Sequence, residues 1–121
     1  MKNQTFRMTM LYDFYGELLT DRQKEFYQLY YDDDLSLSEI AENYGISRQG
    51  VRDVIVRAEN YMTEIEDKTG LVKRFMHYVP HVEAIEQASD EIRQMNVRLF
   101  EDKRLGELLD TIDTEAAALK N

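Results

Sequence analysis

Cysteine and tryptophan are absent from this sequence, and turn-forming residues are scarce, with one proline and five glycines in 121 residues. The lack of cysteine excludes a disulfide framework, a zinc site built on thiolates and thiol catalysis. Long apolar runs are also missing, since none approaches the roughly 20 residues that a membrane-spanning helix needs. We find no pattern of a signal peptide at the start of the chain. We therefore expect a cytoplasmic protein without a membrane partner.

Acidic residues dominate what is present, with 24 Asp and Glu against 15 Lys and Arg and a net charge of −9. Hydrophobic residues make up 43% of the chain, which is typical of a folded, soluble protein. The charge is divided almost evenly, because residues 1–61 carry −4 and residues 62–121 carry −5. Neither half is the basic domain that nucleic-acid-binding proteins usually contain.

Apolar residues follow helical spacing almost throughout, whereas strand-type alternation is weak. We therefore predict an all-α protein of about six helices. The six expected helices cover about residues 5–16, 20–31, 37–44, 47–67, 82–95 and 105–119. Residues 71–79 can also be helical, with Pro80 kinking or restarting the helix after them. Two helix starts have capping-box spacing, at Thr20 with Gln23 and at Ser36 with Glu39.

The chain divides most naturally near Gly70, which ends the long helix. We predict a helix-turn-helix domain of about four helices over residues 1–70, followed by a C-terminal helical extension over residues 71–121 that serves packing or oligomerisation.

The segment 37–57 meets the steric requirements of a helix-turn-helix unit. Such a unit needs a small residue where its helices cross, a residue that tolerates positive φ in the turn, an apolar plug, an N-cap and apolar anchors on the second helix. These requirements are met, in that order, by Ala41, Gly45, Ile46, Ser47 and Val51. An ordinary helical hairpin with a glycine turn is the alternative interpretation.

The outward face of the second helix carries residue types that read DNA. At about 100° per residue, this face holds Arg48, Gln49, Arg52, Asp53, Val56 and Arg57, with Arg48 at its edge. The N-terminal part of such a helix enters the major groove, where arginine pairs with guanine and glutamine with adenine. We predict that these residues contact nucleic acid, with Arg48, Gln49 and Arg52 as the best candidates.

The charge around this helix opposes DNA binding. Residues 32–61 hold three basic and seven acidic side chains, a net charge of −4. Neutralisation of phosphates provides most of the affinity for DNA, so DNA binding is expected to be weak. The alternative function is an acidic protein-interaction module that keeps the helix-turn-helix shape and binds a basic partner without binding DNA.

The same motifs resemble known families. Residues 36–42 (SLSEIAE) and 45–48 (GISR), preceded by 19–24 (LTDRQK), are similar to the promoter-reading region at the C-terminal end of bacterial sigma factors. Residues 10–16 (MLYDFYG) and 47–51 (SRQGV) give a closer resemblance to the YlxM-like family of small bacterial proteins, over about residues 8–75. The resemblance implies a helix-turn-helix DNA-binding protein with a regulatory role in the signal recognition particle pathway, and a component of that particle as partner.

Patterns for catalysis and metal binding are weak. His77 and His81 lie four residues apart, but they lack a third ligand and Pro80 lies between them, so we interpret them as structural. The run 32–34 (DDD) lacks the glycine and distal glutamate of a calcium loop. Neither a glycine-rich phosphate loop nor a glycine-flanked nucleophilic serine occurs. We predict no catalytic residue, no cofactor, no metal site and no enzymatic activity.

Two apolar stripes in the C-terminal extension predict an interaction surface. The first consists of Val82, Ile85, Ile92 and Met95, and the second of Leu105, Leu108, Leu109 and Ile112. Stripes of this size are usually covered, either by the chain's own helix-turn-helix domain, by a second subunit or by a partner protein. We predict a homodimer formed through the first stripe.

Overall fold

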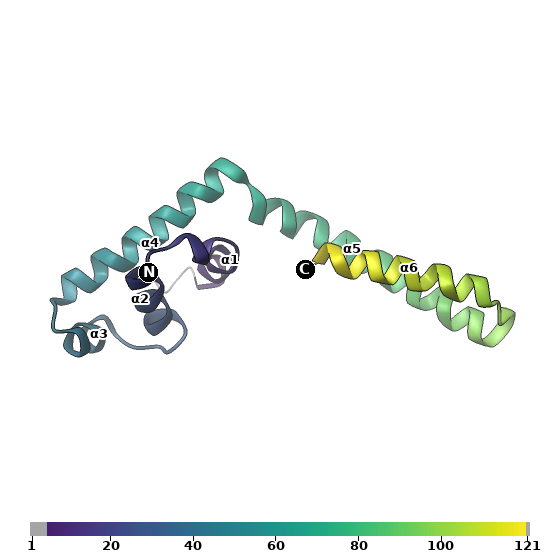
Figure 1. The fold of residues 1–121 in the computed structure, drawn as a ribbon, viewed down its shortest axis with the longest axis horizontal. Coiled ribbons are helices and arrows are strands. Elements are labelled where there is room, and N and C mark those ends of the chain that lie inside the picture. Colours follow the sequence, from purple (N-terminus) through teal and green to yellow (C-terminus); the bar gives the residue numbers. More distant parts are fainter. Residues whose placement is uncertain (1–4, 121) are drawn as a thin grey trace. The chain divides into compact units, whose positions relative to one another are not determined.

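The computed structural model describes residues 5–120, and all regular structure within this range is helical, as predicted. The α-helices are α1 (Thr5–Tyr15), α2 (Asp21–Tyr31), α3 (Leu37–Tyr44), α4 (Arg48–Thr69), α5 (Leu71–Met95) and α6 (Lys103–Lys120) (Figure 1). A 3-10 turn follows α1 over Gly16–Leu18, and a π-helical turn follows α5 over Asn96–Phe100. The chain separates into two compact parts, which we call unit 1 (up to Val72) and unit 2 (from Lys73).

Side-chain caps begin the helices of unit 1 where the sequence predicts them. The Thr20 hydroxyl accepts a hydrogen bond from the Gln23 N–H at 3.2 Å, and the Gln23 side chain accepts one from the Thr20 N–H at 3.0 Å. Ser36 and Glu39 form the same reciprocal pair at the start of α3. Both predicted capping boxes are therefore confirmed.

Helix α4 is the centre of unit 1, because α1, α2 and α3 all pack against it (Figure 1). The core consists of two neighbouring clusters. One joins α1, α2 and α4 around Leu11, Tyr27, Ala58 and Met62, and the other joins α2, α3 and α4 around Phe26, Ile40, Val51 and Ile55. The second cluster fixes the helix-turn-helix segment, since both of its helices contribute to it.

The carboxyl group of Glu66 is buried near the C-terminal end of α4. Glu66 is 8% exposed, and its Oε1 accepts hydrogen bonds from the Tyr15 hydroxyl at 2.6 Å and from the Val72 N–H at 3.0 Å. The helix ends beyond it at Gly70, whose φ of +63° is a conformation that glycine adopts without strain. The carboxyl group therefore ties α1 to the junction between α4 and α5.

Three tyrosine rings from α1 and α2 are in contact, with the pair Tyr12 and Tyr27 stacked and the pair Tyr27 and Tyr31 tilted. The Tyr27 ring centroid is 4.5 Å from that of Tyr12 and 4.6 Å from that of Tyr31. Tyr27 is 2% exposed, and its hydroxyl has no hydrogen-bond partner among the described residues. Burial raises the pKa of Tyr27 above its ordinary value. The contacts between the rings therefore stabilise the fold, whereas the buried Tyr27 hydroxyl, which has no partner among the described residues, destabilises it.

We expect Tyr27→Phe to leave the free energy of unfolding at pH 7 unchanged or to raise it by about 1 kcal/mol, because it removes a buried polar group without a partner. The raised pKa of Tyr27 makes the free energy of unfolding of the wild type depend on pH. The folded state holds the phenol proton more tightly than the unfolded state, so this contribution is complete below about pH 10 and is lost as pH rises beyond it. Tyr27→Phe should therefore lose less stability than the wild type between pH 7 and pH 11.

Urea unfolding followed by circular dichroism at both pH values tests this prediction. Tyr12→Phe is the matched control, because the Tyr12 hydroxyl accepts a hydrogen bond from Gln28 at 2.7 Å and its loss should be destabilising. A Tyr27→Phe variant that is clearly less stable than the wild type at pH 7 would contradict the prediction.

Helix α5 runs unbroken through Pro80, so the predicted restart at this residue is wrong. Proline lacks an N–H and leaves the carbonyl group four residues earlier without its helical partner. Both Pro80 and Met76 are exposed, where water can hydrogen-bond to that carbonyl group. The two helices expected around Pro80 are therefore one.

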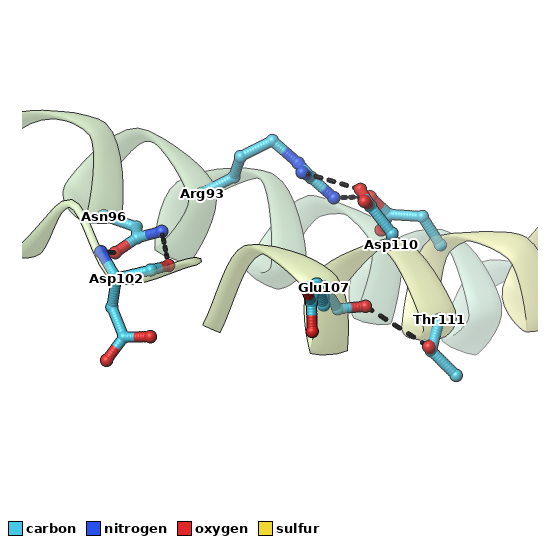
Figure 2. A network of polar contacts seen from close by, with 7 residues as sticks. Arg93, Asn96, Asp102, Glu107, Asp110 and Thr111 are labelled. Carbon is cyan, nitrogen blue, oxygen red and sulfur yellow. Dashed lines mark hydrogen bonds and ion pairs between the residues drawn. The ribbon is translucent and has the colours of Figure 1, made fainter. Parts of the chain in front are cut away.

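Helices α5 and α6 form an antiparallel hairpin in unit 2 (Figure 1). Asn96 holds the turn, since its Nδ2 donates to the Asp102 carbonyl oxygen at 2.9 Å and its Oδ1 accepts from the Asp102 N–H at 2.8 Å (Figure 2). Glu101 completes the turn in the left-handed region with φ of +48°.

Partly exposed ion pairs link the two helices at the sides of their interface. The Arg93 guanidinium group lies 2.9 Å from the Asp110 carboxylate (Figure 2) and 2.7 Å from that of Asp113, and Lys120 lies 2.7 Å from Glu86. The most buried residues of the hairpin are Val82, Ser89, Asn96, Leu109 and Ala116. Val82, which we expected in an intermolecular stripe, is 5% exposed and lies on the side of α5 that faces α6, whereas Ile85, Ile92 and Met95 are exposed.

Candidate nucleic-acid interface

The turn between α3 and α4 is built by the residues that the sequence singles out. Gly45 has φ of +65°, and both its N–H and that of Ile46 donate to the Ala41 carbonyl oxygen. Ser47 then begins α4, because its hydroxyl accepts a hydrogen bond from the Gly50 N–H at 2.9 Å. Each of these residues satisfies a backbone group that the helix ends leave free.

The two helices of the unit share one apolar interior. Ala41 is 6% exposed, and Val51 is fully buried beside it. Ile46 is half-buried and packs on the same cluster. Phe26 of α2 closes this interior and meets the Tyr44 ring edge-on at a centroid distance of 4.9 Å. The positions of α3 and α4 are therefore fixed by a three-helix core rather than by the turn alone.

Gly50 belongs to the same turn, although the helical pattern gave no reason to single it out. A Cβ atom at this position would lie 3.1 Å from the Ser47 hydroxyl and 3.8 Å from Ile46 Cδ1. A larger residue would crowd the hydroxyl group that caps α4. The signal that could have identified it is the presence of a poor helix former three residues after an N-cap.

The structure places the predicted contact residues on the first three turns of α4, facing away from the core. Arg48, Gln49, Arg52, Asp53 and Arg57 are exposed, and Val56 is half-buried. Among the described residues, no ion pair uses any of the three arginines. Their guanidinium groups are therefore free to bind an anionic partner.

Gln49 and Asp53 are joined by a hydrogen bond within the helix. The Gln49 Nε2 donates to the Asp53 carboxylate at 2.9 Å, one turn further along α4. This bond orients the Gln49 amide beside the Asp53 carboxylate. A glutamine that reads adenine needs both its amide nitrogen and its oxygen, so base recognition by Gln49 requires this bond to open.

Most acidic residues of the segment 32–61 belong to elements other than α4. Three stand in the loop after α2 (Asp32–Asp34), and two lie on α3. Glu59 accepts a hydrogen bond from the Tyr31 hydroxyl of α2. Over residues 32–61, Asp53 is the one acidic residue on the outward face, so three arginines and one aspartate give that face a formal charge of +2. Although the segment has a net charge of −4, Arg48, Arg52 and Arg57 therefore form a basic strip along the outward face of α4.

The two histidines lie in unit 2. The His77 and His81 rings are exposed, with their centroids 5.6 Å apart. In the described part of the chain, no group of three or more His, Cys, Asp or Glu residues is arranged to hold a metal ion. Over the same residues, none of the helices combines the length and the apolar character that crossing a membrane requires.

Comparison with known proteins connects this geometry to a family. The family model described as "Putative helix-turn-helix protein, YlxM / p13 like" (UPF0122) matches residues 2–104. A UPF0122 protein of Thermoanaerobacter sp. strain X514 is 48% identical over 87 residues, which are 72% of this chain and 74% of the relative. A UPF0122 protein of Bacillus thuringiensis strain Al Hakam is 40% identical over 113 residues, covering 93% of this chain and all of the relative. These matches extend beyond the helix-turn-helix unit into the hairpin.

Proposed function

Because this chain belongs to the UPF0122 family of YlxM / p13-like helix-turn-helix proteins, we propose that it binds duplex DNA through the outward face of α4 and acts as a cytoplasmic regulator. The observation that carries the proposal is the basic strip of Arg48, Arg52 and Arg57 on a helix whose partner helix, turn and caps have the arrangement used to enter a major groove. A homodimer is part of the proposal, since helix-turn-helix proteins commonly bind two half-sites.

The strip is short, and its size sets the affinity that we expect. Three arginines neutralise few phosphates, so binding to non-specific DNA is weak at physiological salt and is seen best at low ionic strength. Affinity for a specific site must then come from base contacts near the N-terminal end of α4, with Arg52 as the leading candidate.

We expect Arg52→Ala to weaken binding to a specific site by about 1–3 kcal/mol, the contribution of an arginine that pairs with guanine. Arg48→Ala should weaken binding to all sequences alike and reduce the salt slope by about one, because Arg48 lies at the edge of the face and meets phosphate. Fluorescence anisotropy with a site selected from genomic fragments, titrated at several salt concentrations, measures both effects.

Arg98→Ala is the matched control, because it removes the same charge from the turn of the hairpin. This variant should bind like the wild type. The proposal fails if the wild type binds no genomic fragment at low salt, or if Arg52→Ala and Arg98→Ala change binding equally.

A second function is favoured by the acidity of the chain outside the strip. With a net charge of −9 and three aspartates together in an exposed loop, the protein is suited to a basic partner. The resemblance to the YlxM-like family makes a component of the signal recognition particle the candidate that we propose. Affinity capture with and without nuclease separates the two functions, since a partner held through DNA is released by the nuclease and a protein partner is not.

A further inference from the structure

The end of α4 and the first turns of α5 differ in charge from the rest of the chain. Residues 68–82 contain three basic residues and both histidines but no acidic residue, although the net charge of the chain is −9. Asp67 and Glu83 bound this stretch, which is the longest in the sequence without an acidic side chain. A local excess of positive charge creates a potential that attracts anions. The stretch is therefore a candidate anion-binding surface.

Four of these residues share one face of α5. They are Lys73, Arg74, His77 and His81, and we call them the α5 basic face. All four are exposed. At about 100° per residue they lie within a sector of about 100°, and they extend over about 12 Å along the helix. Because α5 runs unbroken through Pro80, the two histidines keep this alignment, and their ring centroids are 5.6 Å apart.

Helix α6 packs on a different side of α5. The Tyr78 hydroxyl donates to the Leu119 carbonyl oxygen at 3.1 Å, and Val82 is buried. Tyr78 and Val82 lie about 90° and 130° around the helix from the middle of the α5 basic face. Beyond His81, the first acidic residue on the side of this face is Glu91, about 15 Å further along the helix. The hairpin therefore leaves the α5 basic face open to a partner.

The beginning of α5 is fixed to unit 1. Val72 is 7% exposed and belongs to the core cluster that joins α1, α2 and α4. Its N–H donates to the Glu66 carboxylate at 3.0 Å. Lys73 and Arg74 follow Val72 directly within the same helix. The two cations of the α5 basic face are therefore held in place by the core of the domain that carries the candidate interface.

We propose that the α5 basic face binds the phosphate backbone of duplex DNA. This inference rests on the proposed function and adds a second part to its interface. The three arginines of α4 neutralise few phosphates, and two further cations supply charge where the acidic chain otherwise lacks it. Lysine, arginine and imidazole N–H groups all donate hydrogen bonds to phosphate oxygens. A face about 12 Å long spans roughly three phosphates of one strand, which are spaced about 3.4 Å apart along the axis.

The composition of the α5 basic face favours this partner over a lipid surface. A helix that lies on a membrane inserts apolar side chains between the cations that bind the headgroups. The α5 basic face consists of cationic and imidazole side chains only. Contacts to phosphate carry no sequence information, so the α5 basic face should strengthen binding to every duplex alike.

The salt dependence of binding gives the expected size of this contribution. Each neutralised phosphate adds about −0.9 to the slope of log K against log salt, so the three arginines of α4 give a slope of about −2.7. Lys73 and Arg74 should bring the slope of the wild type to about −4.5.

The first experiment compares two variants that remove the same pair of residues from the first turn of different helices. Lys73→Gln with Arg74→Gln changes the α5 basic face, and Lys103→Gln with Arg104→Gln changes the same dipeptide at the start of α6. Fluorescence anisotropy over a range of salt concentrations measures the binding of a selected site and of an unrelated duplex. The α5 variant should bind both duplexes at least about tenfold more weakly at about 0.1 M salt, with a slope smaller by about two. The α6 variant should bind like the wild type.

The second experiment needs no substitution, so it applies even if the α5 variant loses its helices by circular dichroism. The chain has two histidines, and both lie on the α5 basic face. Diethyl pyrocarbonate modifies exposed imidazoles, and mass spectrometry counts the modified groups. Bound duplex DNA should suppress most of the modification of His77 and His81.

Four results would overturn the inference. Equal effects of the two double variants, or equal modification of the histidines with and without bound DNA, would show that the α5 basic face does not contact DNA, and would leave the proposed role of α4 standing. A folded α5 variant that loses affinity for the selected site only would show that this face positions α4 rather than binds phosphate. A wild type that binds no duplex at low salt would overturn the proposed function together with this inference.

Discussion

Replacing Phe26 with alanine is expected to lower the free energy of unfolding of unit 1 by about 3–5 kcal/mol. The ring is fully buried and belongs to the cluster that joins α2, α3 and α4, where it also meets the Tyr44 ring. Its removal leaves a cavity at the point where the two helices of the candidate interface are held together. A loss of this size is a large part of the stability of a small domain.

Urea unfolding followed by far-ultraviolet circular dichroism measures the change. Phe6→Ala is the matched control, since Phe6 lies in the same unit and is 69% exposed, so its loss should change the free energy of unfolding by no more than about 0.5 kcal/mol. Equal effects of the two substitutions would show that Phe26 does not hold the core of the helix-turn-helix segment.

Glu66→Ala should lower the same free energy by about 2–4 kcal/mol, because it leaves the buried Val72 N–H without its acceptor and removes one packed methylene group together with the carboxyl group. The Tyr15 hydroxyl loses one partner but keeps its 2.7 Å contact with the Thr69 hydroxyl. Glu66→Gln retains an acceptor oxygen and should therefore lose less stability than Glu66→Ala.

Limited proteolysis locates this effect as well as measuring it. Opening of the junction exposes the backbone around Gly70, so cleavage there should become faster in Glu66→Ala. Glu64→Ala is the control, because Glu64 is exposed and forms a surface ion pair with Lys68 that contributes little stability. If Glu64→Ala and Glu66→Ala are cleaved at equal rates, the carboxyl group of Glu66 does not hold the junction.

Local signals made unit 1 predictable. Capping boxes and a left-handed glycine depend on residues within a few positions of each other, so Ser36 with Glu39, and Gly45 with Ser47, indicate where α3 ends and α4 begins. The outward face of α4 follows from the buried stripe on its other side, because a regular helix has one period. Gly50 escaped notice because its role depends on the space beside the Ser47 hydroxyl, which no periodicity reports.

Unit 2 was harder to predict because some of the contacts that join its two helices are polar. Apolar spacing along α5 placed Val82 in one stripe with Ile85 and Ile92, but the structure buries Val82 and leaves the other two exposed. The hairpin itself forms through Arg93 with Asp110 and Asp113, residues that are about 20 positions apart in sequence. Ion pairs of this kind leave no periodic signal. Asn96, which holds the turn, acts through the backbone groups of Asp102, six residues away, and this contact also leaves no periodic pattern in the sequence.

The order in which the chain is synthesised gives the division at Val72 a further consequence. Every member of the two core clusters of unit 1 lies at or before Val72, so this unit has all of its packing partners before the 49 residues that follow in the sequence are added. Domains fold as units, the N-terminal one first, at translation rates of about 5–20 residues per second. The residues of unit 1 are therefore synthesised about 2–6 s before the first residue of α6, Lys103. Each nascent chain thus contains the complete helix-turn-helix segment before α5 and α6 can form their hairpin.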